Sequence, residues 1–152
     1  AYEADADSRV ILRRMAELNG VSARMTVREF CTRSRLQEEM GSPGKILIVC
    51  DVEGAEIRFI EGGKKTIERD LPSLLIEIHP FSLQRNFSSS GEAVRDYFLS
   101  LGYRMWQLND DNSHMFESTQ IDPKRRWKDY FLIHPKRGAG LPEGMFKKAF
   151  AG

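Results

Sequence analysis

The sequence predicts an open α/β sheet, mostly parallel, with helices on both faces. The run ILIVC at residues 46–50 is continuously apolar, which is typical of a strand that is buried on both faces. A second such run, LLIEI, follows at residues 74–78. Residues 52–73 lie between the two runs. They contain a helical pattern that is broken at Gly62-Gly63, and they are long enough for a crossover helix. We therefore expect the two strands to be parallel neighbours.

The flanking segments predict two further helices and one strand. Asp5 or Asp7 can cap a helix that carries an apolar stripe and ends at Asn19-Gly20. The segment RMTVREF at residues 24–30 is expected to be a strand. Ser90 can cap a helix that Gly102 ends. The apolar stripe of the first helix consists of Ile11, Met15 and Leu18.

The C-terminal part predicts an antiparallel strand pair at residues 103–108 and 130–135. Residues 109–129 between these strands are polar, and they form either a long hairpin loop or an insertion. Residues 138–152 are a glycine-rich tail. The whole chain, residues 1–152, has the length of one domain.

Composition is that of a soluble globular protein, with 41% hydrophobic and 30% charged residues and a net charge of +1. No apolar run is long enough to span a membrane, and the first residues lack the pattern of a signal peptide. Cys31 and Cys50 are too few for a disulfide framework and are expected to be reduced core residues. These features together predict a cytoplasmic protein, and they leave its oligomeric state open.

Positive charge is concentrated in residues 123–137, which contain six lysines or arginines and one aspartate. This segment is either a solvated face or a surface for an anionic partner. Three aromatic residues are expected near the cations of this segment and can stack on nucleic acid bases: Trp106, Trp127 and Tyr130. One alternative function is therefore a cofactor-free module that binds nucleic acid or protein through this segment.

Acidic residues collect where the two buried strands end. Asp51 and Glu53 follow the first strand, and Glu77 and His79 close the second. Ligands of open α/β sheets bind at the carboxyl ends of the strands, so we expect these four side chains to line one site. Crowded carboxylates raise at least one pKa, and such crowding favours binding or catalysis. Glu56 is expected to serve only the first turn of the following helix.

Two other interpretations of this cluster remain open. Glu53 can cap a helix while Glu77 pairs with an arginine, and His79 can make a structural hydrogen bond instead of a ligand contact. Alternatively, Asp51, Glu53, Glu77 and His79 can bind a hard metal ion in a metal-dependent hydrolase.

The segment LIVCDVEGAEIRFIEGG at 47–63, followed by LPSLLIEIHP at 71–80, resembles the FkbM-type methyltransferases. Residues 1–21 are similar to that family's second strand and following helix, with Ala4 in place of the usual proline. The resemblance covers roughly residues 1–108. It implies a Rossmann-like sheet and S-adenosyl-L-methionine-dependent methylation of a hydroxyl on a small molecule or sugar.

The resemblance also implies roles for individual residues. Glu3 matches the acidic residue that accepts hydrogen bonds from the cofactor's ribose hydroxyls, and Asp51 and Glu53 match the motif beside the methyl donor. His79 is the first candidate for the base that takes the acceptor's proton, and Asp51 is the second. Glu77 is expected to line the substrate pocket, and no metal is implied.

In that family, a glycine-rich turn that approaches the cofactor follows the first strand. This turn would come just before Ala1, and the given sequence contains no such segment there. We therefore expect the sheet to be incomplete at its N-terminus, lacking the first strand. A circularly permuted sheet that uses GAGLPEG at residues 138–144 is the alternative to a simple glycine-rich tail.

Overall fold

The computed structural model describes residues 1–29, 47–109 and 115–136. The chain divides into two compact units, Ala1–Glu39 and Met40–Gly152, and each is described by itself. The prediction of one domain over residues 1–152 stays a prediction. Cys31 and the glycine-rich tail lie outside the described residues.

The first unit contains helix α1, Ala6–Leu18, as the capping pattern predicts. Asp5 is its N-cap, and the Asp5 carboxylate accepts a hydrogen bond from the backbone N–H of Ser8 at 2.7 Å. The helix ends at Asn19, and Gly20 has a φ of 65°, a left-handed conformation that glycine adopts without strain.

The strand predicted at residues 24–30 is shorter than expected. A 3₁₀ helix, η1, occupies Ser22–Arg24, and extended pairing is limited to a parallel bridge between Tyr2 and Arg28. The backbone N–H of Glu3 donates to the carbonyl of Arg28, and the N–H of Arg28 donates to the carbonyl of Ala1, both at 2.9 Å. Glu3 is therefore held in an extended segment directly before α1.

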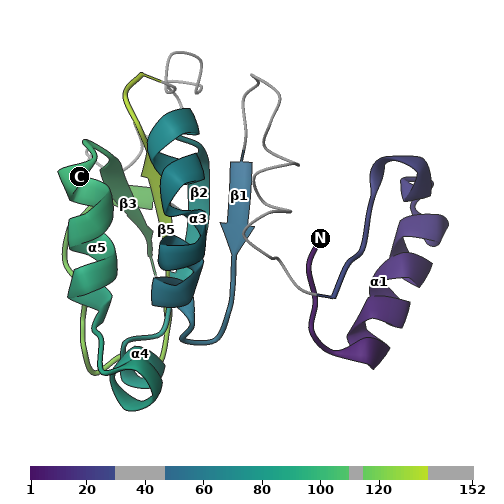
Figure 1. The fold of residues 1–152 in the computed structure, drawn as a ribbon, viewed down its shortest axis with the longest axis horizontal. Coiled ribbons are helices and arrows are strands. Elements are labelled where there is room, and N and C mark those ends of the chain that lie inside the picture. The colour runs from purple at the N-terminus through teal and green to yellow at the C-terminus, as the bar shows by residue number, and fades with distance from the viewer. Residues whose placement is uncertain (30–46, 110–114, 137–152) are drawn as a thin grey trace. The chain divides into compact units, whose positions relative to one another are not determined.

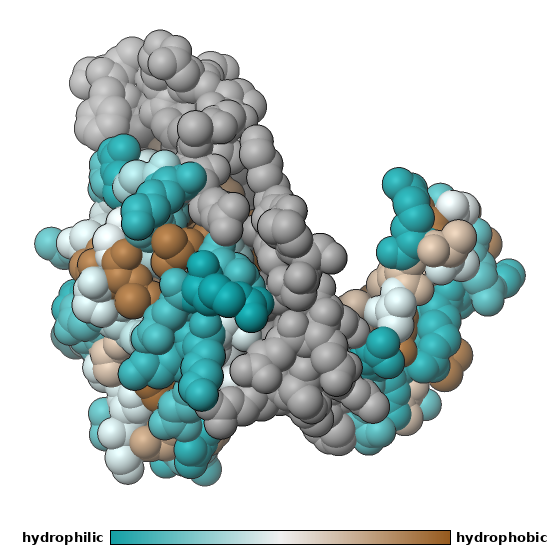
Figure 2. Space-filling view, turned by 45° about the horizontal axis from the view of Figure 1, so that its top comes forward, coloured by the Kyte–Doolittle hydropathy of each residue, from teal (hydrophilic) through white to brown (hydrophobic). Residues whose placement is uncertain are grey.

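The predicted apolar stripe of α1 is exposed, with Ile11, Met15 and Leu18 retaining more than half of their accessible surface. Figure 2 includes this hydrophobic surface on the first unit, drawn in brown among hydrophilic residues. Ala16 is the buried residue of this helix.

The second unit is built on a five-stranded open sheet in the order β1-β2-β5-β3-β4. β1 and β2 are parallel, as predicted, and the other three pairings are antiparallel. A mostly parallel sheet is thus confirmed only for the β1–β2 pair. The described chain between β3 and β5 contains β4 and no helix, so β5 cannot be reached by the crossover that a parallel neighbour needs. The strands are β1 Leu47–Cys50, β2 Ser73–Ile78, β3 Arg104–Leu108, β4 Met115–Glu117 and β5 Lys128–Ile133.

The described residues of this unit form three helices: α3 Glu56–Asp70, α4 Pro80–Phe87 and α5 Gly91–Ser100. α3 is the predicted crossover, and it runs through Gly62-Gly63, where the sequence suggested a break. The sequence pattern did not predict α4, although Pro80 in its first turn is a signal for the start of a helix. Figure 1 shows α3 and α5 side by side over one face of the sheet. The helices predicted for the opposite face are not among the described residues of this unit.

The core lies between these helices and the sheet. Leu74, Ile76 and Ile78 alternate along β2 with half-buried residues and are 0–1% exposed. From the helices, Ile67 and Phe98 are fully buried against them. Cys50 is buried and not in a disulfide, as predicted. Among the described residues, no helix combines the length and the apolar character that crossing a membrane requires.

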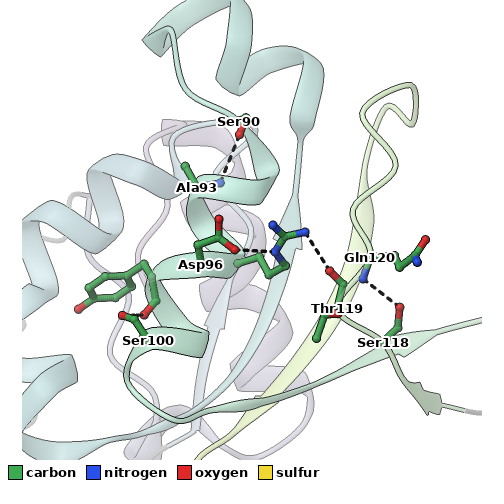
Figure 3. A network of polar contacts seen from close by, with 9 residues as sticks. Ser90, Ala93, Asp96, Ser100, Ser118, Thr119 and Gln120 are labelled. Carbon is green, nitrogen blue, oxygen red and sulfur yellow. Dashed lines mark hydrogen bonds and ion pairs between the residues drawn. The ribbon is translucent and has the colours of Figure 1, made fainter.

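The segment from 109 to 129 contributes β4 to the sheet edge and then returns to β5. Arg95 on α5 fixes the return, since its guanidinium donates to the carbonyl of Thr119 at 3.1 Å and to the carboxylate of Asp96 at 2.8 Å (Figure 3). The Tyr130 hydroxyl donates to the carbonyl of Gln120 at 3.1 Å. The segment is therefore tied to both α5 and β5.

Candidate functional site

A tight turn joins β1 to α3 and positions the acidic side chains at this end of the sheet. Asp51 follows the last residue of β1 and is exposed. Glu53 has a φ of 51° and Gly54 a φ of 103°. A Cβ atom on Gly54 would lie 2.2 Å from the Cβ of Ser82 on α4. Both the backbone conformation and the close approach of α4 thus require glycine at this position.

Glu56, the first residue of α3, is fully buried. Its Oε1 atom accepts a hydrogen bond from the backbone N–H of Gly54 at 3.0 Å and lies 2.9 Å from Nδ1 of His79. The expected role at the start of the helix is present, and the carboxylate also holds the imidazole. A buried carboxylate is stabilised by such hydrogen bonds.

His79 follows β2 and is the N-cap residue of α4. Its carbonyl accepts from the N–H of Leu83 at 3.0 Å, and the residue is 2% exposed. With the proton on Nδ1, the imidazole donates to Glu56 and directs the Nε2 lone pair toward the carboxylates at the sheet edge.

The Nε2 atom of His79 lies 3.1 Å from Oε1 of Glu77 and 3.2 Å from Oε2 of Glu53. Neither carboxylate is oriented for a hydrogen bond, and Nε2 has no hydrogen-bond partner among the described residues. Ligand atoms of Asp51, Glu77 and His79 all lie within 4.8 Å of one another. Four residues predicted for one site, Asp51, Glu53, Glu77 and His79, are thus at the carboxyl ends of β1 and β2.

Asp129 on β5 adds a further carboxylate to the site, since it pairs directly across from Glu77. The sequence did not predict it. Burial raises the pKa of Glu77, and the charges of Asp51, Asp129 and Glu53 raise it further. Burial likewise raises the pKa of Asp129, with Asp51 adding to the shift against the opposing effect of Lys128. No sequence signal predicts this contact, because it depends on β5 pairing with β2.

The contact between Glu56 and His79 was also missed. Side chains in the first turn of a helix point back toward its N-terminus, and this is the signal that connects Glu56 with the end of the neighbouring strand. The alternative pairing of Glu77 with an arginine is not found within the described residues, where the Glu77 carboxylate lies 3.1 Å from Nε2 of His79.

Glu3 belongs to the first unit. One of its oxygens accepts from the backbone N–H of Asp5 at 2.8 Å, and the residue is half-buried. A carboxylate has lone pairs for several hydrogen bonds, so Glu3 retains acceptor capacity at the end of its extended segment. This chemistry fits ribose hydroxyls.

The aromatic residues near the basic segment are mostly in the core. Trp106 is 8% exposed and Tyr130 is 2% exposed, whereas Trp127 is 47% exposed. The guanidinium of Arg104 lies over the Trp106 ring, 4.9 Å from its centre. Tyr130 and Trp106 are therefore not available to stack on bases, and the expected aromatic surface is reduced to Trp127.

Comparison with known families gives one match. The model of the methyltransferase FkbM domain matches residues 20–105, which is more than half of the chain. The match spans the turn after β1, all of β2 and the residues that surround His79. Neither a curated protein nor a solved structure matches the chain.

Proposed function

This chain belongs to the FkbM methyltransferase family, and we propose that it is an S-adenosyl-L-methionine-dependent O-methyltransferase that acts on a hydroxyl of a small molecule or sugar. The observation that carries the proposal is the group of Asp51, Glu77 and His79 at the ends of two parallel strands, inside the matched region. This is the edge of an open α/β sheet where ligands bind.

Bound S-adenosyl-L-methionine supplies a methyl group on a positively charged sulfur. An acceptor oxygen would take this methyl group as the sulfur–methyl bond broke. The proton of the acceptor hydroxyl must leave for a base of the protein. His79 is our first candidate for this base, because a proton on Nδ1 that is donated to Glu56 would leave Nε2 unprotonated.

An acceptor must approach Nε2 of His79 past two carboxylates. The Glu53 side chain is 77% exposed and can turn into solvent, whereas that of Glu77 is 21% exposed. A movement of Glu53 therefore opens the path to the imidazole. Asp51, which is exposed on the same edge, is the second candidate because an acceptor can reach it without any such movement.

The remaining residues are proposed to bind and orient the ligands. Glu3 accepts the ribose hydroxyls of the cofactor. Asp51 and Glu53 lie beside the methyl donor, and Glu77 lines the acceptor pocket. The cytoplasmic location is part of the same proposal.

Titration calorimetry with S-adenosyl-L-methionine tests the cofactor. We expect saturable binding, weakened by more than about tenfold in Glu3→Ala, because two charge-assisted hydrogen bonds are lost. Glu17→Ala is the matched control on the same unit, since Glu17 is exposed and pairs with Arg14. Equal affinities of the Glu3→Ala and wild-type chains would argue against this role of Glu3.

Transfer of a labelled methyl group to a panel of small hydroxyl compounds and sugars tests the reaction. We expect Asp51→Asn and His79→Gln to lower the rate by about a hundredfold or more, the usual contribution of a general base. Labelling of amines alone would replace the proposed oxygen acceptor with nitrogen.

A further inference from the structure

We propose that Asp51, Glu77 and His79 bind a divalent metal cation. The three residues offer two carboxylate oxygens and one imidazole nitrogen, all within 4.8 Å of one another. Two ligands on opposite sides of one ion are about 4–5 Å apart, since metal–oxygen bonds are about 2.0–2.6 Å long. One ion can therefore reach all three with small movements of the side chains.

The buried imidazole is an independent observation that points to a ligand. His79 is 2% exposed, and its Nε2 atom has no hydrogen-bond partner among the described residues, although two carboxylates lie 3.1 and 3.2 Å away. A buried polar atom without a partner is costly. A cation between Nε2 and the carboxylates would use this lone pair.

Glu56 supplies the outer partner that metal-binding histidines usually have. Its buried carboxylate lies 2.9 Å from Nδ1 of His79 and is held in turn by the N–H of Gly54. Such a carboxylate fixes the tautomer and orientation of the imidazole and raises its basicity. The arrangement is therefore preorganised on the backbones of α3 and α4.

Charge at this edge of the sheet also favours a cation. Glu53 and Asp129 lie beside the three proposed ligands. Within the described residues, neither Glu53 nor Glu77 forms an ion pair with a lysine or arginine, and both carboxylates lie near Nε2 of His79 instead. A bound cation would relieve the repulsion between these carboxylates.

The mixture of ligands selects the probe. Carboxylates suit Mg²⁺, Ca²⁺ and Mn²⁺, whereas imidazole favours transition metals. Mn²⁺ satisfies both preferences. Cation binding goes beyond the proposed methyl transfer and does not depend on it. A metal-bound Nε2 cannot also take a proton, so with the cation in place the role of base falls to the second candidate, Asp51, through the carboxylate oxygen that does not bind the ion. A role for the cation in orienting the acceptor hydroxyl rests on the proposed function.

The test is a titration of the 152-residue chain with Mn²⁺. Binding is monitored by calorimetry and by the loss of the electron paramagnetic resonance signal of the free ion. We expect one ion per chain with a Kd below about 1 mM. Asp51→Asn and Glu77→Gln should each raise the Kd by more than about tenfold, and Glu56→Gln by about tenfold through loss of the outer partner.

Glu61→Gln is the control, because Glu61 is an exposed carboxylate on α3 that pairs with Arg58. The Glu61→Gln chain should bind Mn²⁺ with the same Kd as the unmodified chain. Nitrogen coupling in the pulsed spectrum should report a bound imidazole and should disappear in His79→Gln. Asp51 is exposed, so the Asp51→Asn chain is expected to fold and keeps the test valid even if His79→Gln unfolds.

Binding that is unsaturable, that survives Asp51→Asn and Glu77→Gln, or that shows no nitrogen coupling would overturn the site. Calorimetry with S-adenosyl-L-methionine on the same samples separates the two proposals. Mn²⁺ binding without cofactor binding supports the cation site and counts against cofactor binding by these 152 residues, whereas the opposite result overturns the cation site alone.

Discussion

The helix-covered face and the carboxyl edge of the sheet use strand β2 in opposite ways. On the face, Leu74, Ile76 and Ile78 are 0–1% exposed and pack under α3 and α5. At the edge, Glu77 lies opposite Asp129 and close to Asp51, and its pKa is raised by burial and by these charges. Burial of apolar surface stabilises the face. At the edge, repulsion between the carboxylates lowers the stability of the folded state, and such crowded groups are typical of functional sites.

The largest effect is expected from a cavity on the covered face. Phe98 is fully buried on α5 and contacts Tyr97 and Tyr103 edge-on, with ring centres 5.1 and 5.4 Å apart. Phe98→Ala should lower the free energy of unfolding by about 3–5 kcal/mol in a urea titration. Phe81→Ala on α4 is the control, since Phe81 is 63% exposed and its loss should cost about 0.5 kcal/mol or less.

The next effect concerns the turn that delivers the acidic residues. Gly54→Ala should lower the free energy of unfolding by about 1–3 kcal/mol or more, because alanine is strained at a φ of 103° and its Cβ meets Ser82. In Gly62→Ala, the added Cβ meets no atom within 4 Å inside α3. This control should stabilise the chain by about 0.5–1 kcal/mol. Equal effects of the two substitutions would contradict the geometry of the turn.

A smaller loss is expected where the face meets the edge. Glu56→Gln removes the charge that holds Nδ1 of His79, and we expect a loss of about 1–3 kcal/mol in the free energy of unfolding. Nitrogen chemical shifts of the His79 ring should show a change in the tautomer ratio. An unchanged ratio would mean that another contact fixes the ring.

The smallest effect has the opposite sign. In the presence of a chelator, Glu77→Gln should raise the thermal midpoint at pH 7, since the folded chain no longer holds a crowded carboxylate. A raised folded pKa means that the folded state binds more protons than the unfolded state. Stability of the wild-type chain therefore falls as pH rises above the ordinary glutamate range.

The advantage of Glu77→Gln should accordingly vanish at acidic pH, where Glu77 is protonated in both states. Thermal melts of the two chains across this pH range provide the measurement. A lower midpoint for Glu77→Gln at pH 7 would show that the contact with His79 outweighs the repulsion.

Local pattern was enough to predict α1, α5 and the parallel β1–β2 pair with its crossover. Their signals are caps at Asp5 and Ser90 and continuous apolar runs, which act within a few residues. The break expected at Gly62-Gly63 was wrong, because packing of α3 against the unit overrides a propensity cost of about 1 kcal/mol per glycine.

The sequence by itself determined which side chains follow β1 and β2, because the direction of a strand and the order of residues assign Asp51, Glu53, Glu77 and His79 to one edge. Only the tertiary structure decided that Glu56 holds His79 and that Asp129 faces Glu77. The physical reason is the sequence separation over which each interaction acts. Helix caps and apolar runs act between residues close in sequence, whereas these contacts depend on how α3 starts and on the position of β5 in the sheet.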